Sequence, residues 1–220
     1  MEEINELFDN ITEQPEPARN GVVTTVNSVI SSVCYSDKEA IDGITTLFLN
    51  GKPFDLDPCY SYGKFYKGCQ EPIHKFDLTP KTPDTQQADV SNIPLISSSV
   101  NSIMFDPPFM FGTHGQTKNN IMTKRFTMFD KFRELETMYK GALKEFYRLL
   151  KDKGILAFKC QDYTDSKTTL THCLVHKWAT EQGFYAKDIF ILIAKARIYN
   201  PSLTQRHARK FHSYYFVFEK

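Results

Sequence analysis

One strand end constrains the fold of this chain more than any other feature of its sequence. Residues 103–105 form a short apolar run typical of a buried strand, and the run stops at Asp106-Pro107-Pro108-Phe109. Proline has no backbone N–H for a sheet ladder and its ring fixes φ, so the strand has to end there. In an open parallel α/β sheet, ligands gather at the carboxyl ends of the strands. The sequence therefore predicts a rigid strand end that presents a carboxylate, backbone carbonyl groups and an aromatic ring.

Buried strands alternate with amphipathic helices along the chain. This order predicts a mainly parallel sheet that helices cover on both faces. The expected strands lie at residues 53–58, 103–105, 155–158, 188–194 and 213–218. Capping signals and apolar spacing predict helices from Ser36 to Asn50-Gly51, from Asp130 to Lys153-Gly154, and through Leu170 to Gly183. The last two strands have no helix between them, so we expect them to pair antiparallel.

The composition is that of an ordinary globular protein. Hydrophobic residues make up 41% of the chain and charged residues 24%, which excludes collagen, coiled coil and whole-chain disorder. The formal net charge is +1, so basic residues that bind a nucleic acid would have to be concentrated locally. Residues 1–20 are rich in acids and are expected to form a loosely ordered acidic leader before a single domain at residues 21–220.

No segment of the sequence predicts a membrane span or a metal site. No stretch approaches the ~20 apolar residues of a membrane helix, and Met1-Glu2-Glu3 does not resemble a signal peptide, so we expect a cytoplasmic protein. The cysteines are scattered without Cys-x-x-Cys spacing. His172 and His176 have the spacing of two ligands on one helical face, but no third ligand is placed by spacing.

Acidic residues also precede the Asp-Pro-Pro-Phe motif. Asp57 ends an alternating strand, and Gly63 follows in a loop where a glycine would let the backbone approach a ligand closely. Asp-Pro followed by glycine is also a common surface turn, and both interpretations remain open. Asp77 follows Asp57 by about twenty residues, the relation of the ribose-binding acid in dinucleotide-type folds, and Asp89 comes next.

The motif Asp106-Pro107-Pro108-Phe109 resembles the Asp-Pro-Pro-aromatic motif of S-adenosylmethionine-dependent amino-methyltransferases, especially the DNA adenine-N6 enzymes. The resemblance covers most of the chain from about Cys34 onward, with the motifs in unpermuted order. It implies a Rossmann-like, doubly wound α/β fold with a mostly parallel seven-stranded sheet and an antiparallel C-terminal edge hairpin at residues 184–218. The catalytic residues that it implies are Asp106, Pro107, Pro108 and Phe109.

The resemblance also implies a site for S-adenosylmethionine. Residues 57–63 are similar to the family's cofactor motif, Asp77 to its ribose acid and Asp89 to its adenine-contacting acid. The implied cofactor residues are Asp57, Pro58, Cys59, Tyr60, Gly63, Asp77, Asp89 and Phe105. The family's cofactor loop is usually richer in glycine than residues 60–63, and a separate target-recognition domain is not expected here.

These features predict methyl transfer from S-adenosylmethionine to the exocyclic N6 amine of adenine in DNA. An aromatic amine is a poor nucleophile, because its lone pair is delocalised into the ring. Asp106 and the Pro107 carbonyl would accept its N–H groups, and Phe109 would stack on the base, worth about 1–3 kcal/mol. The adenine has to be flipped out of a duplex or supplied single-stranded. The residues expected to contact phosphates on two long loops are Lys118, Lys124, Arg125, Arg206, Arg209 and Lys210.

Several alternatives remain open. The chain would also suit an RNA base amino-methyltransferase or a catalytically idle nucleic-acid-binding subunit with the same fold. DNA cytosine-N4 enzymes more often have serine in place of Asp106, and enzymes that methylate protein glutamine usually have asparagine there. A homodimer or a separate recognition partner is compatible with the sequence.

Overall fold

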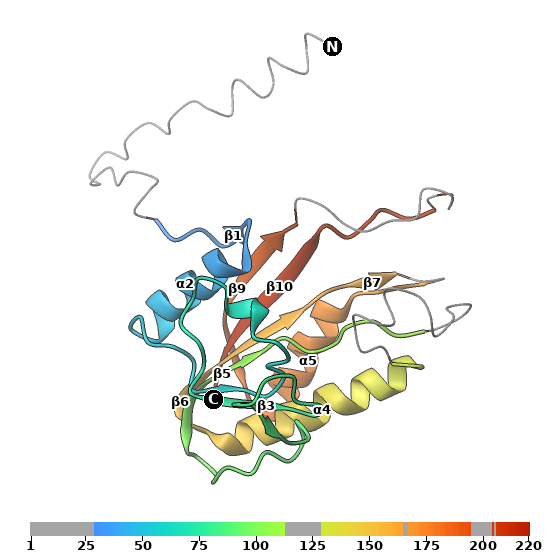
Figure 1. The fold of residues 1–220 in the computed structure, drawn as a ribbon. Coiled ribbons are helices and arrows are strands. Elements are labelled where there is room, and N and C mark those ends of the chain that lie inside the picture. Colours follow the sequence, from blue (N-terminus) through green and yellow to red (C-terminus); the bar gives the residue numbers. More distant parts are fainter. Residues whose placement is uncertain (1–28, 113–128, 165–166, 195–203, 205) are drawn as a thin grey trace, which may run out of the picture. The chain divides into compact units, whose positions relative to one another are not determined.

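The described part of the chain is built on a mixed, eight-stranded sheet. A computed structural model describes residues 29–112, 129–164, 167–194, 204 and 206–220, and all its helices and strands belong to the unit Ser31–Lys220. The sheet has the order β1-β9-β10-β6-β5-β2-β3-β4 (Figure 1). Its strands are β1 (Val33–Cys34), β2 (Leu56–Asp57), β3 (His74–Asp77), β4 (Gln86–Gln87), β5 (Val100–Phe105), β6 (Leu150–Cys160), β9 (Tyr185–Ile193) and β10 (His212–Glu219). Strands β7 (Tyr163–Thr164) and β8 (Thr168–Thr169) form a separate antiparallel pair.

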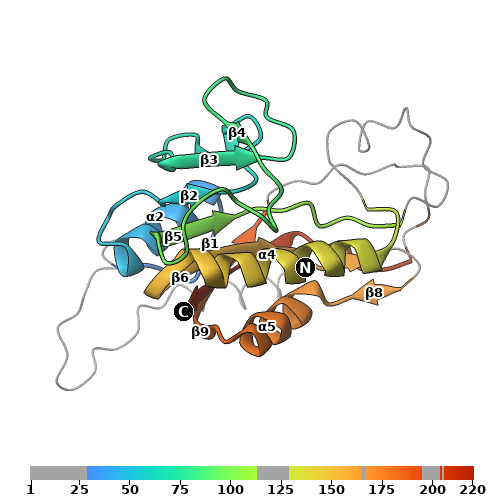
Figure 2. The same cartoon turned by 90° about the horizontal axis from the view of Figure 1, so that it is seen from below.

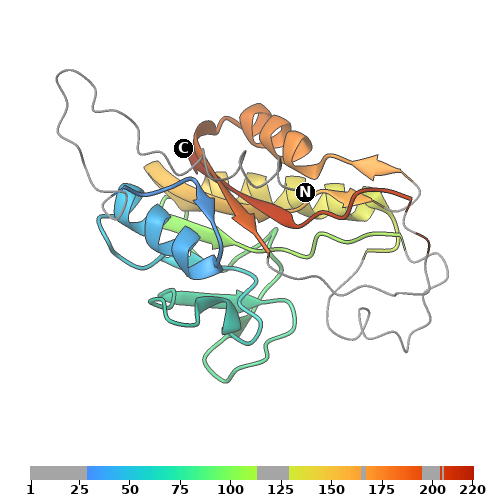
Figure 3. The ribbon, with the colours of Figure 1, turned by 90° about the horizontal axis from the view of Figure 1, so that it is seen from above.

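Helices cover both faces of the sheet, as Figure 3 shows. Helix α2 (Asp37–Phe48) and the 3₁₀ turn η3 (Lys64–Tyr66) contribute to the core on one face. Helices α4 (Phe132–Leu149) and α5 (Thr171–Gln182) contribute to the core on the other. The predicted doubly wound, Rossmann-like α/β fold is therefore confirmed.

The C-terminal strands pair as expected, but the sheet formed by the described residues holds one more strand than the seven predicted. Strand β10 lies antiparallel to both β9 and β6. The short strand β1 pairs in parallel with β9 and so continues the sheet beyond the hairpin. Two residues are too few to show the alternation of a strand, which is why the sequence did not reveal β1.

Helix ends follow the sequence signals in two helices and depart from them in the third. Ser36 caps α2, with its Oγ 3.2 Å from the Glu39 N–H, although Glu39 reaches back to Tyr35 N–H rather than to Ser36 N–H. Helix α5 ends at Gly183 with φ 108°. Helix α4, however, has its N-cap at Lys131 and ends at Leu149.

The end of α4 was predicted wrongly because its apolar spacing runs directly into the next strand. Leu150 is as buried as the helix residues before it but already has extended backbone. Gly154, expected as the helix stop, lies inside β6, where a Cβ would come within 2.8 Å of the Lys151 carbonyl oxygen. The glycine therefore belongs to an irregular strand and not to a helix C-terminus.

Parallel pairing aligns the carboxyl ends of several strands. Strand β2 pairs in parallel with β3 and β5, and β5 pairs in parallel with β6. Figure 2 shows β3, β2, β5 and β6 side by side over α4. Their carboxyl ends therefore meet at one edge of the sheet. Within the described part of the chain, no helix combines the length and apolarity needed to cross a membrane.

Candidate active site

The carboxyl edge of the sheet brings the predicted acids together. Asp57 ends β2, Asp77 ends β3 and Asp106 follows β5. Cys59 lies among them: burial raises the pKa of its thiol well above the ordinary value, and the charges of Asp57, Asp77, Asp106 and Asp89 raise it further. Acids from four separate segments thus concentrate negative charge around one side chain.

Asp57 is the most buried of these acids, with 2% of its surface exposed. Its carboxylate accepts hydrogen bonds from Cys59 N–H at 2.8 Å and from the Tyr66 hydroxyl at 2.7 Å. Burial nevertheless raises the pKa of Asp57 to about 7, and the charges of Asp106 and Asp77 add to this effect. Near neutral pH, a cation bound at this edge would therefore favour the ionised form.

The loop after Asp57 is shaped by its own tyrosine. Tyr60 is buried, and its ring stacks on Tyr66 with centroids 5.9 Å apart. A Cβ at Gly63, where φ is +67°, would clash with the Tyr60 hydroxyl. The packing of Tyr60 is therefore a sufficient reason for a glycine at position 63, and close approach of a ligand is not needed to explain it. Asp77 holds the same loop, because its Oδ2 accepts Ser61 N–H at 2.9 Å.

Two of the predicted cofactor residues lie in the core. Pro58 is buried. Phe105 has no exposed surface, and its ring contacts Phe146 and Phe158 edge to face, with centroids 4.8 Å apart in both pairs. The Phe105 side chain therefore supports the strand end from below and does not line the site.

The Asp-Pro-Pro-Phe segment follows β5 directly and is partly exposed. The Asp106 side chain is 32% exposed, Pro107 is buried, and Phe109 is half-buried. The Pro108 carbonyl accepts a hydrogen bond from the Tyr139 hydroxyl of α4 at 3.0 Å. No described residue donates to the Pro107 carbonyl. The predicted position thus holds a partly exposed carboxylate and a main-chain carbonyl to which no described residue donates.

Lys159 is a site residue that the sequence analysis did not identify. It stands at the end of β6, one residue beyond the pair Phe105 and Phe158. Its Nζ lies 2.9 Å from Asp37 Oδ1 and 3.4 Å from Asp106 Oδ2. The available signal was a lysine directly after a buried strand. Asp37 gave no such signal, since an acid in the first turn of a helix has a sufficient reason in the helix dipole.

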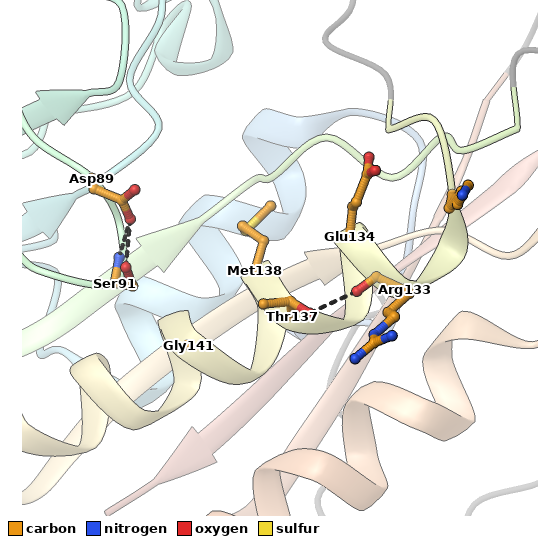
Figure 4. Close-up of a pocket in the computed structure, with 8 residues that line it drawn as sticks. Asp89, Ser91, Arg133, Glu134, Thr137, Met138 and Gly141 are labelled. Carbon is orange, nitrogen blue, oxygen red and sulfur yellow. Dashed lines mark hydrogen bonds between the residues drawn. The ribbon is translucent and has the colours of Figure 1, made fainter.

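A pocket of about 780 Å³ opens beside Asp89. It lies between the loop that follows β4 and the N-terminal half of α4, as Figure 4 shows. Asp89 Oδ1 accepts hydrogen bonds from both the backbone N–H and the hydroxyl of Ser91, at 2.8 and 2.6 Å. These bonds lower the pKa of Asp89, so the pocket carries a fixed negative charge at one wall. The other lining residues come from α4 and its N-cap: Lys131, Arg133, Glu134, Thr137, Met138 and Gly141.

The predicted phosphate-binding residues are only partly described. Lys118, Lys124 and Arg125 lie outside the described residues. A β-bridge between Phe111 and Phe129 joins the two ends of their segment next to the Asp-Pro-Pro-Phe turn.

The second basic segment contains Arg206 and Arg209, which are exposed, and Lys210, which is half-buried. The Lys210 carbonyl accepts a hydrogen bond from Gln161 Nε2 just beyond β6, at 3.2 Å. This contact brings the segment to the same edge of the sheet as Asp106.

The two histidines considered as metal ligands, His172 and His176, contact different side chains. His172 Nδ1 lies 2.7 Å from Asp162 Oδ1, and its ring stacks on Tyr214. His176 lies near Phe216. Among the described residues, no group of three or more His, Cys, Asp or Glu side chains could hold a metal ion.

Comparison with known proteins gives structural similarity only. No protein-family model and no curated protein matches the chain. Among solved structures, a putative DNA modification methylase from Thermus thermophilus, complexed with S-adenosyl-L-methionine, matches at 16% identity and TM-score 0.44, over 60% of this chain and 53% of that one. The N-methyltransferase NodS from Bradyrhizobium japonicum WM9 matches at 11% identity and TM-score 0.45, over 83% and 95%. A SAM-dependent methyltransferase from Archaeoglobus fulgidus matches at 10% identity and TM-score 0.43, over 83% and 94%.

The chain spans about half the length of the first of these proteins. With every one of these TM-scores below 0.5, the matches establish neither the chemistry nor the substrate of this chain. Its fold follows from its own sheet order and helix layers.

Proposed function

We propose that the protein transfers a methyl group from S-adenosylmethionine to the exocyclic N6 amine of adenine in DNA. The observation that carries the proposal is the Asp106-Pro107 turn, where a partly exposed carboxylate stands beside a main-chain carbonyl at the edge where the acids converge. An amine with two N–H groups needs two such acceptors. The carboxyl ends of parallel strands are also where α/β sheets bind their ligands.

The acids fit a cationic cofactor. S-adenosylmethionine would supply a methyl group on a sulfonium sulfur that leaves as a neutral thioether. Asp57, which is buried with both carboxylate oxygens already bonded, would stabilise the positive charge without touching the cofactor. The partly exposed Asp77 would accept hydrogen bonds from the cofactor's hydroxyl groups. Neither acid has a basic partner among the described residues. Asp89 and the apolar side chain of Met138 give the adjacent pocket the polar and apolar surfaces that an adenine ring requires.

Asp106 and Pro107 would activate the amine by hydrogen bonding. Asp106 Oδ2 faces Lys159, and no described residue donates to Oδ1. If Oδ1 and the Pro107 carbonyl each accept one N–H, the nitrogen is drawn towards tetrahedral geometry and its lone pair turns out of the ring plane. Methyl transfer leaves a positive charge on the nitrogen, which the Asp106 carboxylate stabilises until a proton is lost. Positioning and electrostatics are then the main contributions of the protein.

Phe109 and the basic segments support a nucleic-acid substrate. The half-buried Phe109 ring follows the two prolines directly and offers a stacking surface for a base. Arg206 and Arg209 are exposed on a segment attached to the same edge. A base removed from its stack could lie on Phe109 while its phosphates contact this segment.

Methyl transfer can be measured directly. The protein would be incubated with S-adenosylmethionine carrying a labelled methyl group and with adenine-containing DNA, and the nucleosides would be analysed by mass spectrometry. We expect N6-methyladenine from the wild type and a loss of at least about 100-fold in Asp106→Ala, because the hydrogen bond to the amine is removed. Calorimetry should show that Asp106→Ala still binds S-adenosylmethionine.

Asp152→Ala is the matched control, since Asp152 is an exposed acid near the other end of β6. It should retain wild-type activity. Parallel reactions on RNA and on cytosine-only DNA separate the alternatives, because label in those substrates alone would replace the adenine-N6 assignment. A wild type that binds no S-adenosylmethionine would contradict the proposal and favour an idle binding subunit.

A further inference from the structure

Lys159 contacts side chains from four different segments, one of which carries Asp106. Its ammonium group bonds to Asp37 at the start of α2, and the Tyr215 hydroxyl of β10 donates to the same Asp37 oxygen. The Lys159 Nζ also lies 4.8 Å from the centroid of the Phe65 ring and 5.4 Å from that of Tyr215. With 17% of its side chain exposed, Lys159 has little freedom to leave this position. A lysine in an exposed surface ion pair would not be surrounded by two acids and two aromatic rings.

The charges around Asp106 act in opposite directions. Burial and the charge of Asp37 raise the pKa of Asp106 and Lys159 lowers it, and the net shift is upward because burial has the largest effect. Asp57 on β2 repels the same carboxylate. Among the described residues that face Asp106, Lys159 is the only cation.

The other titratable groups near Asp106 stay neutral. Cys59 and Tyr66 on the β2 side, Tyr139 on α4 and Tyr215 on β10 all have pKa values raised well above the ordinary range, in each case chiefly by burial. Burial lowers the pKa of Lys159 itself, but the charges of Asp106 and Asp37 outweigh this and the net shift is upward. Lys159 therefore stays charged wherever the enzyme would work.

We propose that Lys159 is a positioning residue for methyl transfer, which holds Asp106 ionised with one oxygen directed at the substrate amine, while Asp37 and Tyr215 fix the lysine in turn. This inference rests on the proposed function. Lys159 contacts Oδ2, so Oδ1 is left for the amine. An ionised carboxylate accepts an N–H better than a protonated one, and it also stabilises the positive charge that develops on the nitrogen.

Three variants test this role. Lys159→Met removes the charge but keeps much of the apolar stem, Lys159→Arg keeps the charge, and Asp37→Asn removes the acid that opposes the ionisation of Asp106. For each, the rate of methyl transfer would be measured from pH 5 to pH 9. The ionisation of the Asp106 carboxyl would be followed by carbon-13 NMR, with Asp106→Asn used to assign the signal.

If Lys159 acts through its charge, Lys159→Met and Asp37→Asn should shift the Asp106 titration in opposite directions. Lys159→Met should be about tenfold slower than wild type at pH 6 and should recover to within about threefold at pH 9, because each pH unit changes the ionised fraction of a carboxyl group up to tenfold. Its Asp106 titration should move to higher pH. Lys159→Arg should keep the wild-type profile. In Asp37→Asn the titration should move to lower pH, because the repulsion from Asp37 is lost while the amide oxygen can still accept a hydrogen bond from Lys159.

A purely structural role gives a different result. If Lys159→Met is slower by the same factor at every pH, or if its Asp106 titration matches that of the wild type, the inference is wrong. The NMR titration needs no activity, so it decides the role of Lys159 even if no methyl transfer is found. Conversely, a wild type that binds no S-adenosylmethionine contradicts the proposed function while leaving the titration result valid.

Discussion

The folded protein disfavours the ionised form of Asp57. Its carboxyl group is buried, and no described basic side chain pairs with it. Its pKa is raised from 3.8 to about 7, chiefly by burial. Between about pH 4 and pH 7, Asp57 is therefore protonated in the folded chain and ionised in the unfolded chain. The stability from this proton is complete below that pH and is lost as the pH rises to about 7.

Replacing Asp57 with asparagine should therefore remove a pH dependence of stability. Asparagine keeps an acceptor for the Cys59 N–H but carries no charge. As the pH rises from 4 to 7, the free energy of unfolding of Asp57→Asn should increase relative to that of the wild type by at most about 4 kcal/mol. Urea unfolding at a series of pH values would measure it. A difference that does not vary with pH would show that folding does not change the pKa of Asp57.

The same carboxyl group should couple cofactor binding to pH. A cation at the carboxyl edge stabilises ionised Asp57, so the affinity of the wild type for S-adenosylmethionine should rise as the pH increases through about 7. Asp57→Asn should bind more weakly at pH 8 and show little pH dependence. Calorimetry in two buffers of different ionisation enthalpy would detect the proton that the wild type releases. If the wild type releases no proton on binding at pH 7, cofactor binding does not change the ionisation of Asp57.

At the scale of elements, helix α2 links a local capping signal to the site. Ser36 Oγ both accepts the Glu39 N–H and donates to the Glu39 carboxylate, and Asp37 is the next residue along the chain. Ser36→Ala should cost about 1 kcal/mol, or about 2–4 °C in Tm, and should also slow methyl transfer because Asp37 loses its fixed position. Thermal unfolding and activity would be measured together.

Ser36→Thr, which keeps the cap, should restore both properties, and the exposed Ser32→Ala serves as control. Loss of stability with full activity would mean that Asp37 is fixed by Lys159 and Tyr215 alone.

The elements also show what the sequence could reveal. Caps, glycine stops and apolar spacing identified α2 and α5, and proline chemistry identified the end of β5, because each signal lies within a few residues. The end of α4 was missed because helical spacing continues into a buried strand. The ion pair of Lys159 and Asp106 spans 53 residues of sequence and depends on the pairing of β5 with β6. No local pattern contains that information.

At the scale of the whole molecule, charge is distributed unevenly although the net formal charge is only +1. Acids gather at the carboxyl edge of the sheet around Cys59. The basic segment that contains Arg206, Arg209 and Lys210 reaches the same edge through Gln161. A polyanion that approached the acids without such a segment would be repelled. If the proposed function holds, the cationic cofactor and the phosphate backbone would bind to separate surfaces next to Asp106.

Replacing Arg206, Arg209 and Lys210 together with glutamine should weaken binding of single-stranded DNA without regard to sequence. Each lost phosphate contact should reduce the slope of log K against log salt by about 0.7. Binding of S-adenosylmethionine should not change, since the segment lies outside the acid cluster. Lys144→Gln/Lys153→Gln, which removes exposed charges from α4 and from the start of β6, is the control and should retain the wild-type slope. If the triple variant also retains it, DNA is held by other residues, and Lys118, Lys124 and Arg125 become the next group to replace.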